Sequence, residues 1–165
     1  MKIEALKDIA NDFLLTYYQV PLEIPIERNN RLRTTQGRYV MKHDGTPLRI
    51  DLSGSTLDYG TEEAIIGILK HECIHYALHK LNKPYKDGTP IFEAELKKHH
   101  APSTGTCFIG KLYVFTCDAC GKVGETWKKQ LTKTPEKYRT TCCKARLTWT
   151  GEQIYDGSIK VSSSM

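Results

Sequence analysis

Hydrophobic residues recur along the first half of the chain with two different periods. In the segment 3–17 they occupy positions 3, 6, 9, 13, 14 and 17, the spacing of an amphipathic helix. In the segment 22–26, apolar and polar residues alternate, which predicts a half-buried strand. Runs at 37–42 and 47–52 flank an Asp-Gly dipeptide at 44–45, a strong turn signal. We therefore expect an antiparallel hairpin after the first strand.

Two further helices are predicted from their end signals. Thr61 is a suitable N-cap, and the two glutamates that follow it suit the positive end of a helix dipole. This helix should end near Leu81, because Pro84 follows soon afterwards. Thr89 before Pro90 marks another helix start, since proline is favoured at the first helical position.

The character of the sequence changes after residue 101. The stretch 101–106 consists of small, linker-like residues, and short strand-like runs follow at 112–115, 124–127 and 146–149. We predict an α+β protein with two domains. Residues 1–101 would form a domain of helices and a small antiparallel sheet, and residues 102–165 a β module with a C-terminal tail.

Charge is unevenly distributed between these two parts. Residues 1–100 contain 14 Lys/Arg and 14 Asp/Glu, whereas residues 101–165 contain 10 and 5, so the net charge of +5 lies in the second part. A basic module can attract DNA, and aromatic side chains among lysines can stack on unpaired bases. They can equally form the core of a small sheet, which we favour for most of them. The aromatic residues concerned are Tyr113, Phe115, Trp127, Tyr138 and Trp149.

The chain lacks features of membrane or secreted proteins. It has no run of 18 apolar residues, so no membrane span is expected. Its N-terminus lacks the continuous apolar stretch and cleavage site of a secretory signal. We therefore expect a cytoplasmic protein, in which clustered cysteines are more often metal ligands than disulfides.

The stretch HECIH, residues 71–75, lies in the middle of the predicted long helix. His71 and His75 are about 40° apart around a helix and one turn along it, so their rings can converge on one metal ion. Glu72 lies on the adjoining face, where it can reach a water molecule without ligating the metal. This arrangement is typical of zinc peptidases. Cys73, between the histidines, is expected to be a small buried hydrophobe.

A catalytic zinc usually has three protein ligands, so a third is needed. The candidates are His79, Asp87, Glu93 and His99. The helix continues roughly 10 Å beyond His75, and the segment 82–87 can return about 16 Å when extended. Asp87 therefore has a suitable position, while an ordinary turn aspartate is the equal alternative. Glu93 is the fallback, and His79 lies two turns beyond His71.

The segment from His71 to Pro102 resembles the SprT-like metallopeptidase domain, to which the Spartan DNA–protein crosslink proteases also belong. The resemblance includes the N-terminal helix, the Gly-Arg strand near residue 37 and an aromatic residue at Phe92. It implies that His71 and His75 are metal ligands, that Glu72 is the general base and that a cysteine zinc ribbon follows. Members usually carry a histidine shortly before the aromatic. Here Asp87 occupies that place, and carboxylate oxygen is an acceptable zinc ligand.

Four cysteines near the C-terminus suggest a structural zinc site. Cys117 and Cys120, followed by a glycine, form one half of a zinc ribbon. The other half is irregular, because Cys142 and Cys143 are adjacent, and Thr140 stands where the first cysteine of a second pair belongs. Both adjacent cysteines can ligate, Cys107 can complete the set, or the module can be metal-free. We favour a bound zinc.

These features predict a zinc metallopeptidase that hydrolyses peptide bonds in protein substrates, with one catalytic and one structural Zn²⁺. One rival is a DNA-binding protein with a vestigial metal site. Another is a structural or regulatory metal protein that neither cleaves proteins nor binds DNA.

Overall fold

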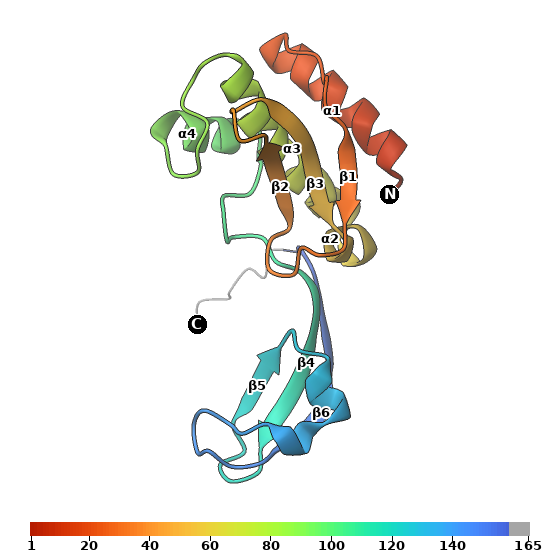
Figure 1. The fold of residues 1–165 in the computed structure, drawn as a ribbon, viewed down its shortest axis with the longest axis vertical. Coiled ribbons are helices and arrows are strands. Elements are labelled where there is room, and N and C mark those ends of the chain that lie inside the picture. The colour runs from red at the N-terminus through yellow and green to blue at the C-terminus, as the bar shows by residue number, and fades with distance from the viewer. Residues whose placement is uncertain (159–165) are drawn as a thin grey trace. The chain divides into compact units, whose positions relative to one another are not determined.

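The computed structural model describes residues 1–158, which divide into two units (Figure 1). The first unit runs from Met1 to Ile109 and resumes at Asp156. The second, Gly110–Tyr155, is inserted between these segments. No helix within residues 1–158 is long and apolar enough to cross a membrane.

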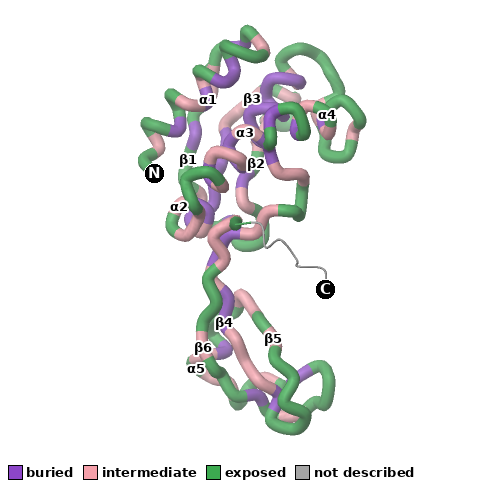
Figure 2. The backbone as a smooth tube through the Cα atoms, turned by 180° about the vertical axis from the view of Figure 1, so that it is seen from behind, coloured by how far each residue is buried: buried purple, intermediate pink, exposed green. Residues whose placement is uncertain are grey.

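Two helices form most of the core of the first unit. The predicted N-terminal helix, α1 (Ile3–Tyr18), buries one stripe of side chains, Leu6, Ala10, Phe13 and Leu14. The predicted long helix, α3 (Glu62–Lys80), begins where the Thr61 hydroxyl accepts the N–H of Ala64 at 3.1 Å. It is buried along most of its length, because it packs against α1 and against the sheet. Figure 2 shows this concentration of buried residues in the first unit.

The predicted hairpin forms, with β2 (Gly37–Met41) antiparallel to β3 (Pro47–Ser53). The sheet as a whole is mixed, because β1 (Ile26–Asn29) pairs in parallel with β3. The strand order is β1-β3-β2, so β3 is central and β2 has a free edge. The expectation of a wholly antiparallel sheet is therefore wrong for β1. The cause is the connection 30–36, which crosses the end of β3 and places β1 and β2 on opposite sides of it.

The first strand begins later than its alternating pattern suggests. Leu22 and Ile24 do pack against the core, but the ladder starts where the carbonyl of Pro25 accepts the N–H of Ile50 at 2.9 Å. Pro21 and Pro25 have no N–H to donate. The predicted alternation of partly buried and exposed residues is present, but it belongs to an irregular segment that leads into the strand.

Two short helices complete the first unit. Helix α2 (Gly54–Tyr59) was not predicted from the sequence. Its first turn is capped by the Ser53 hydroxyl, which accepts the N–H of Thr56 at 2.9 Å. The predicted helix α4 spans Pro90–Lys98. Its N-cap residue Thr89 makes no side-chain cap, because its hydroxyl donates to the carbonyl of Lys86 instead.

The second unit is built on a three-stranded sheet of order β5-β4-β6. Its elements are β4 (Ile109–Cys117), β5 (Val123–Thr126), α5 (Gln130–Lys133), a 3₁₀ turn (Pro135–Lys137) and β6 (Leu147–Asp156). The central strand β4 is the most buried, whereas β6 is largely exposed (Figure 2). Of the five aromatic residues noted in the sequence, Tyr113 is buried, Trp149 is exposed and the others lie between. All three predicted strand-like runs lie in strands, and β4 and β5 match within three residues at each end, but β6 continues to Asp156, well beyond the predicted end at residue 149.

Candidate metal centre and cysteine cluster

His71 and His75 occupy successive turns of α3, on a part of the helix that is buried beneath the sheet. Their Nε2 atoms are 3.2 Å apart, so both rings point at the same spot. The long helix brings them together, because residues four apart lie on one face. Phe92 of α4 stacks on the ring of His75, with centroids 4.1 Å apart, and limits how that ring can turn.

The other nitrogen of each ring faces a backbone carbonyl. His71 Nδ1 lies 2.8 Å from the carbonyl oxygen of Pro102, and His75 Nδ1 is hydrogen-bonded to that of Tyr85. A carbonyl oxygen can only accept, so each Nδ1 must carry the proton. This fixes both tautomers and leaves both Nε2 lone pairs free, as in histidines that ligate metals.

Asp87 supplies a third acceptor at the same point. Its Oδ1 lies 3.3 Å from His71 Nε2 and 3.5 Å from His75 Nε2, and it accepts the hydroxyl proton of Thr104 at 2.5 Å. Ligand atoms at about 2.0–2.1 Å from a tetrahedral zinc lie about 3.3 Å from one another. The three observed separations fit this spacing. The return loop therefore brings Asp87 to the position that the sequence analysis considered, among the residues that could hold a metal ion.

Three acceptor atoms gathered in this way form a site that could hold a cation. A proton is a poor candidate, because burial lowers the pKa of His75 below its ordinary value. Burial raises the pKa of Asp87, but the hydrogen bond from Thr104 and the two histidines lower it overall, so the carboxylate stays charged. Two imidazoles and one carboxylate are a suitable donor set for a divalent metal such as zinc.

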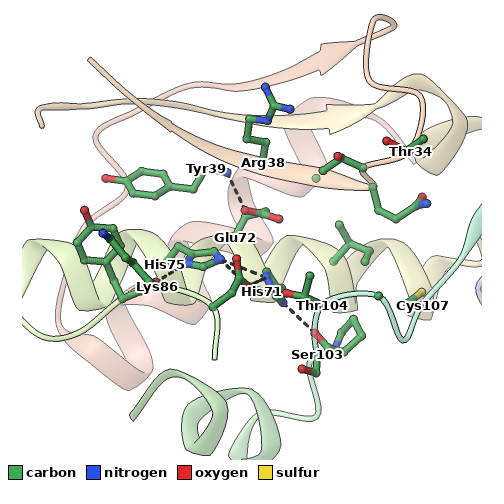
Figure 3. Close-up of a pocket in the computed structure, with 18 of the residues that line it drawn as sticks. Thr34, Arg38, Tyr39, His71, Glu72, His75, Lys86, Ser103, Thr104 and Cys107 are labelled. Carbon is green, nitrogen blue, oxygen red and sulfur yellow. Dashed lines mark hydrogen bonds and ion pairs between the residues drawn. The ribbon is translucent and has the colours of Figure 1, made fainter. Parts of the chain in front are cut away.

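Glu72 lies between the histidines and strand β2 (Figure 3). Its Oε2 accepts the backbone N–H of Tyr39 at 2.7 Å, and burial raises the pKa of its carboxyl to about 8. Gly37 allows this contact, since a Cβ there would lie only 2.9 Å from Glu72 Oε1. No role was predicted for this glycine from the sequence. A glycine inside a strand often marks the close approach of another group, and that signal could have found it.

The remaining candidates for the third ligand lie elsewhere. His79 Nδ1 is 2.8 Å from the hydroxyl of Tyr39, and its ring stacks on Tyr85. His99 is buried against α1. Glu93 lies near the site, but its oxygens bind the backbone of Gly88 and the hydroxyl of Ser103 rather than joining the cluster.

The histidine pair opens into a cleft of about 710 Å³. Its walls come from β2 and the segment before it, from α3, and from the loops around residues 85–87 and 102–108. His71, Glu72 and His75 all line it, so the candidate centre is accessible to a ligand in the cleft (Figure 3). The backbone carbonyls of Tyr85 and Pro102, which hold the rings, could not be found from sequence because any residue supplies one.

All four predicted cysteines of the second unit cluster together. The sulfur atoms of Cys117, Cys120, Cys142 and Cys143 all lie within 4.8 Å of one another, and Cys120 and Cys142 are 3.6 Å apart. Sulfur ligands at about 2.3 Å from a tetrahedral zinc lie about 3.8 Å apart, so the set fits one ion. Both adjacent cysteines therefore belong to the group. Cys107 belongs to the first unit, with its thiol 4.0 Å from the carbonyl of Gly157, and Cys73 is buried in the core as expected.

The two halves of this cluster are matching turns. In the first, the N–H of Gly121 donates to the carbonyl of Cys117 at 2.8 Å. In the second, the N–H of Lys144 donates to that of Thr140 at 3.0 Å. Thr140 thus takes the place of a cysteine, and its hydroxyl is 3.3 Å from the sulfur of Cys117. Cys142 compensates by contributing a thiol from within the turn.

The thiols influence one another's protonation. The hydrogen bond with Thr140, followed by the backbone of Cys120, lowers the pKa of Cys117 to about 6. The side chain of Cys120, followed by burial, raises the pKa of Cys143 to about 12. A structural zinc ion would bind the deprotonated form of such cysteines.

The fold and the two clusters define an α+β protein with a His-His-Asp candidate metal site and a four-cysteine module. A sequence profile of the SprT-like family matches residues 6–108, and the chain belongs to that family. "Protein SprT-like" of Bacillus subtilis (strain 168) is 32% identical over 153 residues, which cover 89% of this chain and 97% of that protein. The protein of the same name from Bacillus cereus (strain ATCC 14579) is 34% identical over 125 residues, 73% and 80% of the two chains. No solved structure matches the chain.

Proposed function

We propose that this protein is a zinc-dependent metallopeptidase that hydrolyses peptide bonds in protein substrates. The observation that carries the proposal is the convergence of His71 Nε2, His75 Nε2 and Asp87 Oδ1 within hydrogen-bonding distance of one another. The Nδ1 atom of each histidine is hydrogen-bonded to a backbone carbonyl, so the two Nε2 lone pairs are aimed at a common point, where Asp87 Oδ1 also lies. Membership of the SprT-like family supports the same proposal.

His71, His75 and Asp87 would hold the metal, and Glu72 would handle protons. When bound, a zinc ion supplies Lewis acidity, which polarises a peptide carbonyl and lowers the pKa of a water molecule. Glu72 takes a proton from the attacking water and later gives it to the leaving amine. The N–H of Tyr39 holds the Glu72 carboxylate at the edge of the cleft, and a buried carboxyl with a raised pKa is suited to both steps.

The substitution Glu72→Gln tests this assignment. It removes the proton acceptor but retains an oxygen for the N–H of Tyr39, so we expect peptidase activity to fall by about 10²–10⁴-fold. Zinc content should remain that of the wild type. Glu63→Gln is the matched control, because Glu63 lies exposed in the first turn of the same helix. Wild-type activity in Glu72→Gln would exclude Glu72 from the reaction.

We also propose that the cysteine cluster binds a structural zinc ion. The supporting observation is that the exposed Cys120, Cys142 and Cys143 lie beside the buried Cys117, with all four sulfur atoms within 4.8 Å of one another. We expect two zinc ions in the wild-type chain. One should remain when His71 is replaced by alanine, and one when Cys117 is replaced by serine.

A second candidate function is association with DNA through the inserted unit. The supporting observation is charge, because residues 110–155 contain 9 Lys/Arg and 4 Asp/Glu, with Trp149 exposed on β6. Binding should weaken steeply as salt concentration rises. Replacing the exposed Lys128 and Lys129 with glutamine should reduce retention on single-stranded DNA. Unchanged retention would argue against this function.

A further inference from the structure

Glu93 lies in the first turn of α4, facing two loops that border the candidate metal centre. Its Oε1 accepts the backbone N–H of Gly88 at 3.1 Å, and its Oε2 accepts the hydroxyl proton of Ser103 at 2.9 Å. One carboxylate therefore connects the loop before α4 to the loop after it.

Each of these loops holds parts of the candidate site. Gly88 directly follows Asp87, in the loop whose Tyr85 carbonyl binds His75 Nδ1. Ser103 lies between Pro102, whose carbonyl binds His71 Nδ1 at 2.8 Å, and Thr104, whose hydroxyl binds Asp87 Oδ1 at 2.5 Å. The three groups that hydrogen-bond to the site residues, namely the carbonyls of Tyr85 and Pro102 and the hydroxyl of Thr104, therefore all lie within three residues of a Glu93 contact.

Neither loop has regular secondary structure over these residues, so hydrogen bonds of this kind must fix its conformation. Gly88 has a φ of +78° and an open surrounding, and the chain at that point gains little from packing. A hydrogen bond to its N–H holds the peptide that follows Asp87. Small displacements of this loop would alter all three distances between the converging atoms.

We propose that Glu93 is a positioning residue that sets the affinity and geometry of the metal centre by tying these two loops together. This inference rests on the proposed metal site. It assigns Glu93 a role through other residues rather than as a ligand. Both of its oxygens are already engaged, and neither belongs to the His71, His75 and Asp87 group.

Two substitutions separate these roles. In Glu93→Gln the amide oxygen can still accept from Gly88, and the amide N–H₂ can donate to the hydroxyl of Ser103. Glu93→Ala removes both contacts. If Glu93 acts by tying the two loops together, zinc binding should be retained in Glu93→Gln and weakened in Glu93→Ala. A ligand or charge role predicts that both variants fail equally.

The measurement is the zinc dissociation constant of the histidine site, obtained by chelator competition with the full chain. His71→Ala serves as the reference for zinc bound elsewhere. We expect Glu93→Ala to weaken binding about 10- to 100-fold, the range found for groups that orient metal ligands. Glu93→Gln should stay near the wild type. The free energy of unfolding of each chain in chelator shows whether the metal-free fold is intact.

Glu95→Gln is the matched control, since it makes the same change on the same helix. Glu95 accepts the hydroxyl proton of Tyr18 at 2.6 Å and has no contact with either loop, so its loss should lower stability without changing zinc affinity. If Glu93→Ala unfolds, Ser103→Ala removes half of the connection and should still weaken zinc binding.

The outcomes are distinct. Wild-type zinc affinity in Glu93→Ala or Ser103→Ala would overturn the proposal that Glu93 ties the two loops together. An equal loss of zinc affinity in Glu93→Gln and Glu93→Ala would overturn it as well. If the wild type binds no more zinc than His71→Ala does, the proposed metal site itself is wrong. Weaker zinc binding in Glu93→Ala, together with wild-type zinc binding in Glu93→Gln, supports the inference.

Discussion

Adding one methyl group at Gly37 should disable the catalytic base while leaving the metal ligands in place. Gly37 is the first residue of β2, and its α-carbon faces Glu72 on α3. In Gly37→Ala, the new Cβ would lie 2.9 Å from Glu72 Oε1, 3.0 Å from its Cγ and 2.9 Å from Cγ2 of Ile68. Ordinary contacts begin at about 3.4 Å, so these atoms must move apart by about 0.5 Å.

The cost of this overlap can be estimated. Inserting one methyl group into a packed interior typically destabilises a protein by about 1–3 kcal/mol. Glu72 cannot retreat without lengthening its 2.7 Å hydrogen bond with the N–H of Tyr39. Misplacing a reacting group by about 1 Å can cost on the order of 10²-fold in rate. We therefore expect kcat/KM to fall by roughly 10- to 100-fold. The lower figure corresponds to a displacement of Glu72 by about 0.5 Å and the upper figure to about 1 Å.

The assay combines three measurements on Gly37→Ala: peptidase kinetics, zinc affinity and urea unfolding. Zinc affinity should be unchanged, because the three atoms nearest to the added methyl belong to Glu72 and Ile68 and not to a metal ligand. Gly151→Ala is the control, since a Cβ at that position meets no atom within 4 Å. Wild-type kcat/KM in Gly37→Ala, or equal losses of activity and zinc binding, would refute the reasoning.

Two further predictions concern other parts of the chain. Lys144 has a φ of 54°, in the turn position that Gly121 occupies in the first half of the cysteine cluster. A left-handed conformation costs a non-glycine residue about 1 kcal/mol, so Lys144→Gly should raise the thermal midpoint of the zinc-loaded chain, and a lower midpoint would contradict this. Burial, then Lys98, lowers the pKa of His99 below its ordinary 6.5, although Glu95 opposes the shift. The pKa of His99 is therefore higher in the unfolded chain than in the folded one. The stability that neutral His99 contributes is complete above pH 6.5 and is lost as the pH falls below that value. His99→Phe, which keeps a ring beside Phe13 and Tyr17, should flatten the fall in unfolding free energy between pH 7 and pH 5, and an unchanged slope would exclude His99 as its cause.

The sequence predicted those parts of the site that depend on local geometry. His71, Glu72 and His75 share one helix, and helical periodicity alone sets their relative positions. Asp87 was considered because a chain of known length can return from the end of that helix. Neither inference needs knowledge of the rest of the fold, which is why both could be made from residue spacing.

The parts that sequence did not predict depend on contacts between distant segments. The parallel pairing of β1 follows from the path of residues 30–36, which has no characteristic pattern of its own. Backbone carbonyls orient the histidine rings, and the sequence does not distinguish one carbonyl from another. Glu93 was considered as a ligand because of its residue type, whereas its contacts with Gly88 and Ser103 depend on how two loops meet.

A metal ion bound by two imidazoles and a carboxylate is the central claim, and anomalous X-ray scattering at the zinc edge tests it most directly. Crystals of the protein at saturating zinc should show a peak about 2.0–2.2 Å from His71 Nε2, His75 Nε2 and an oxygen of Asp87. A second peak should lie among the four cysteine sulfurs. An ordered histidine pair without a peak between its rings would contradict the account.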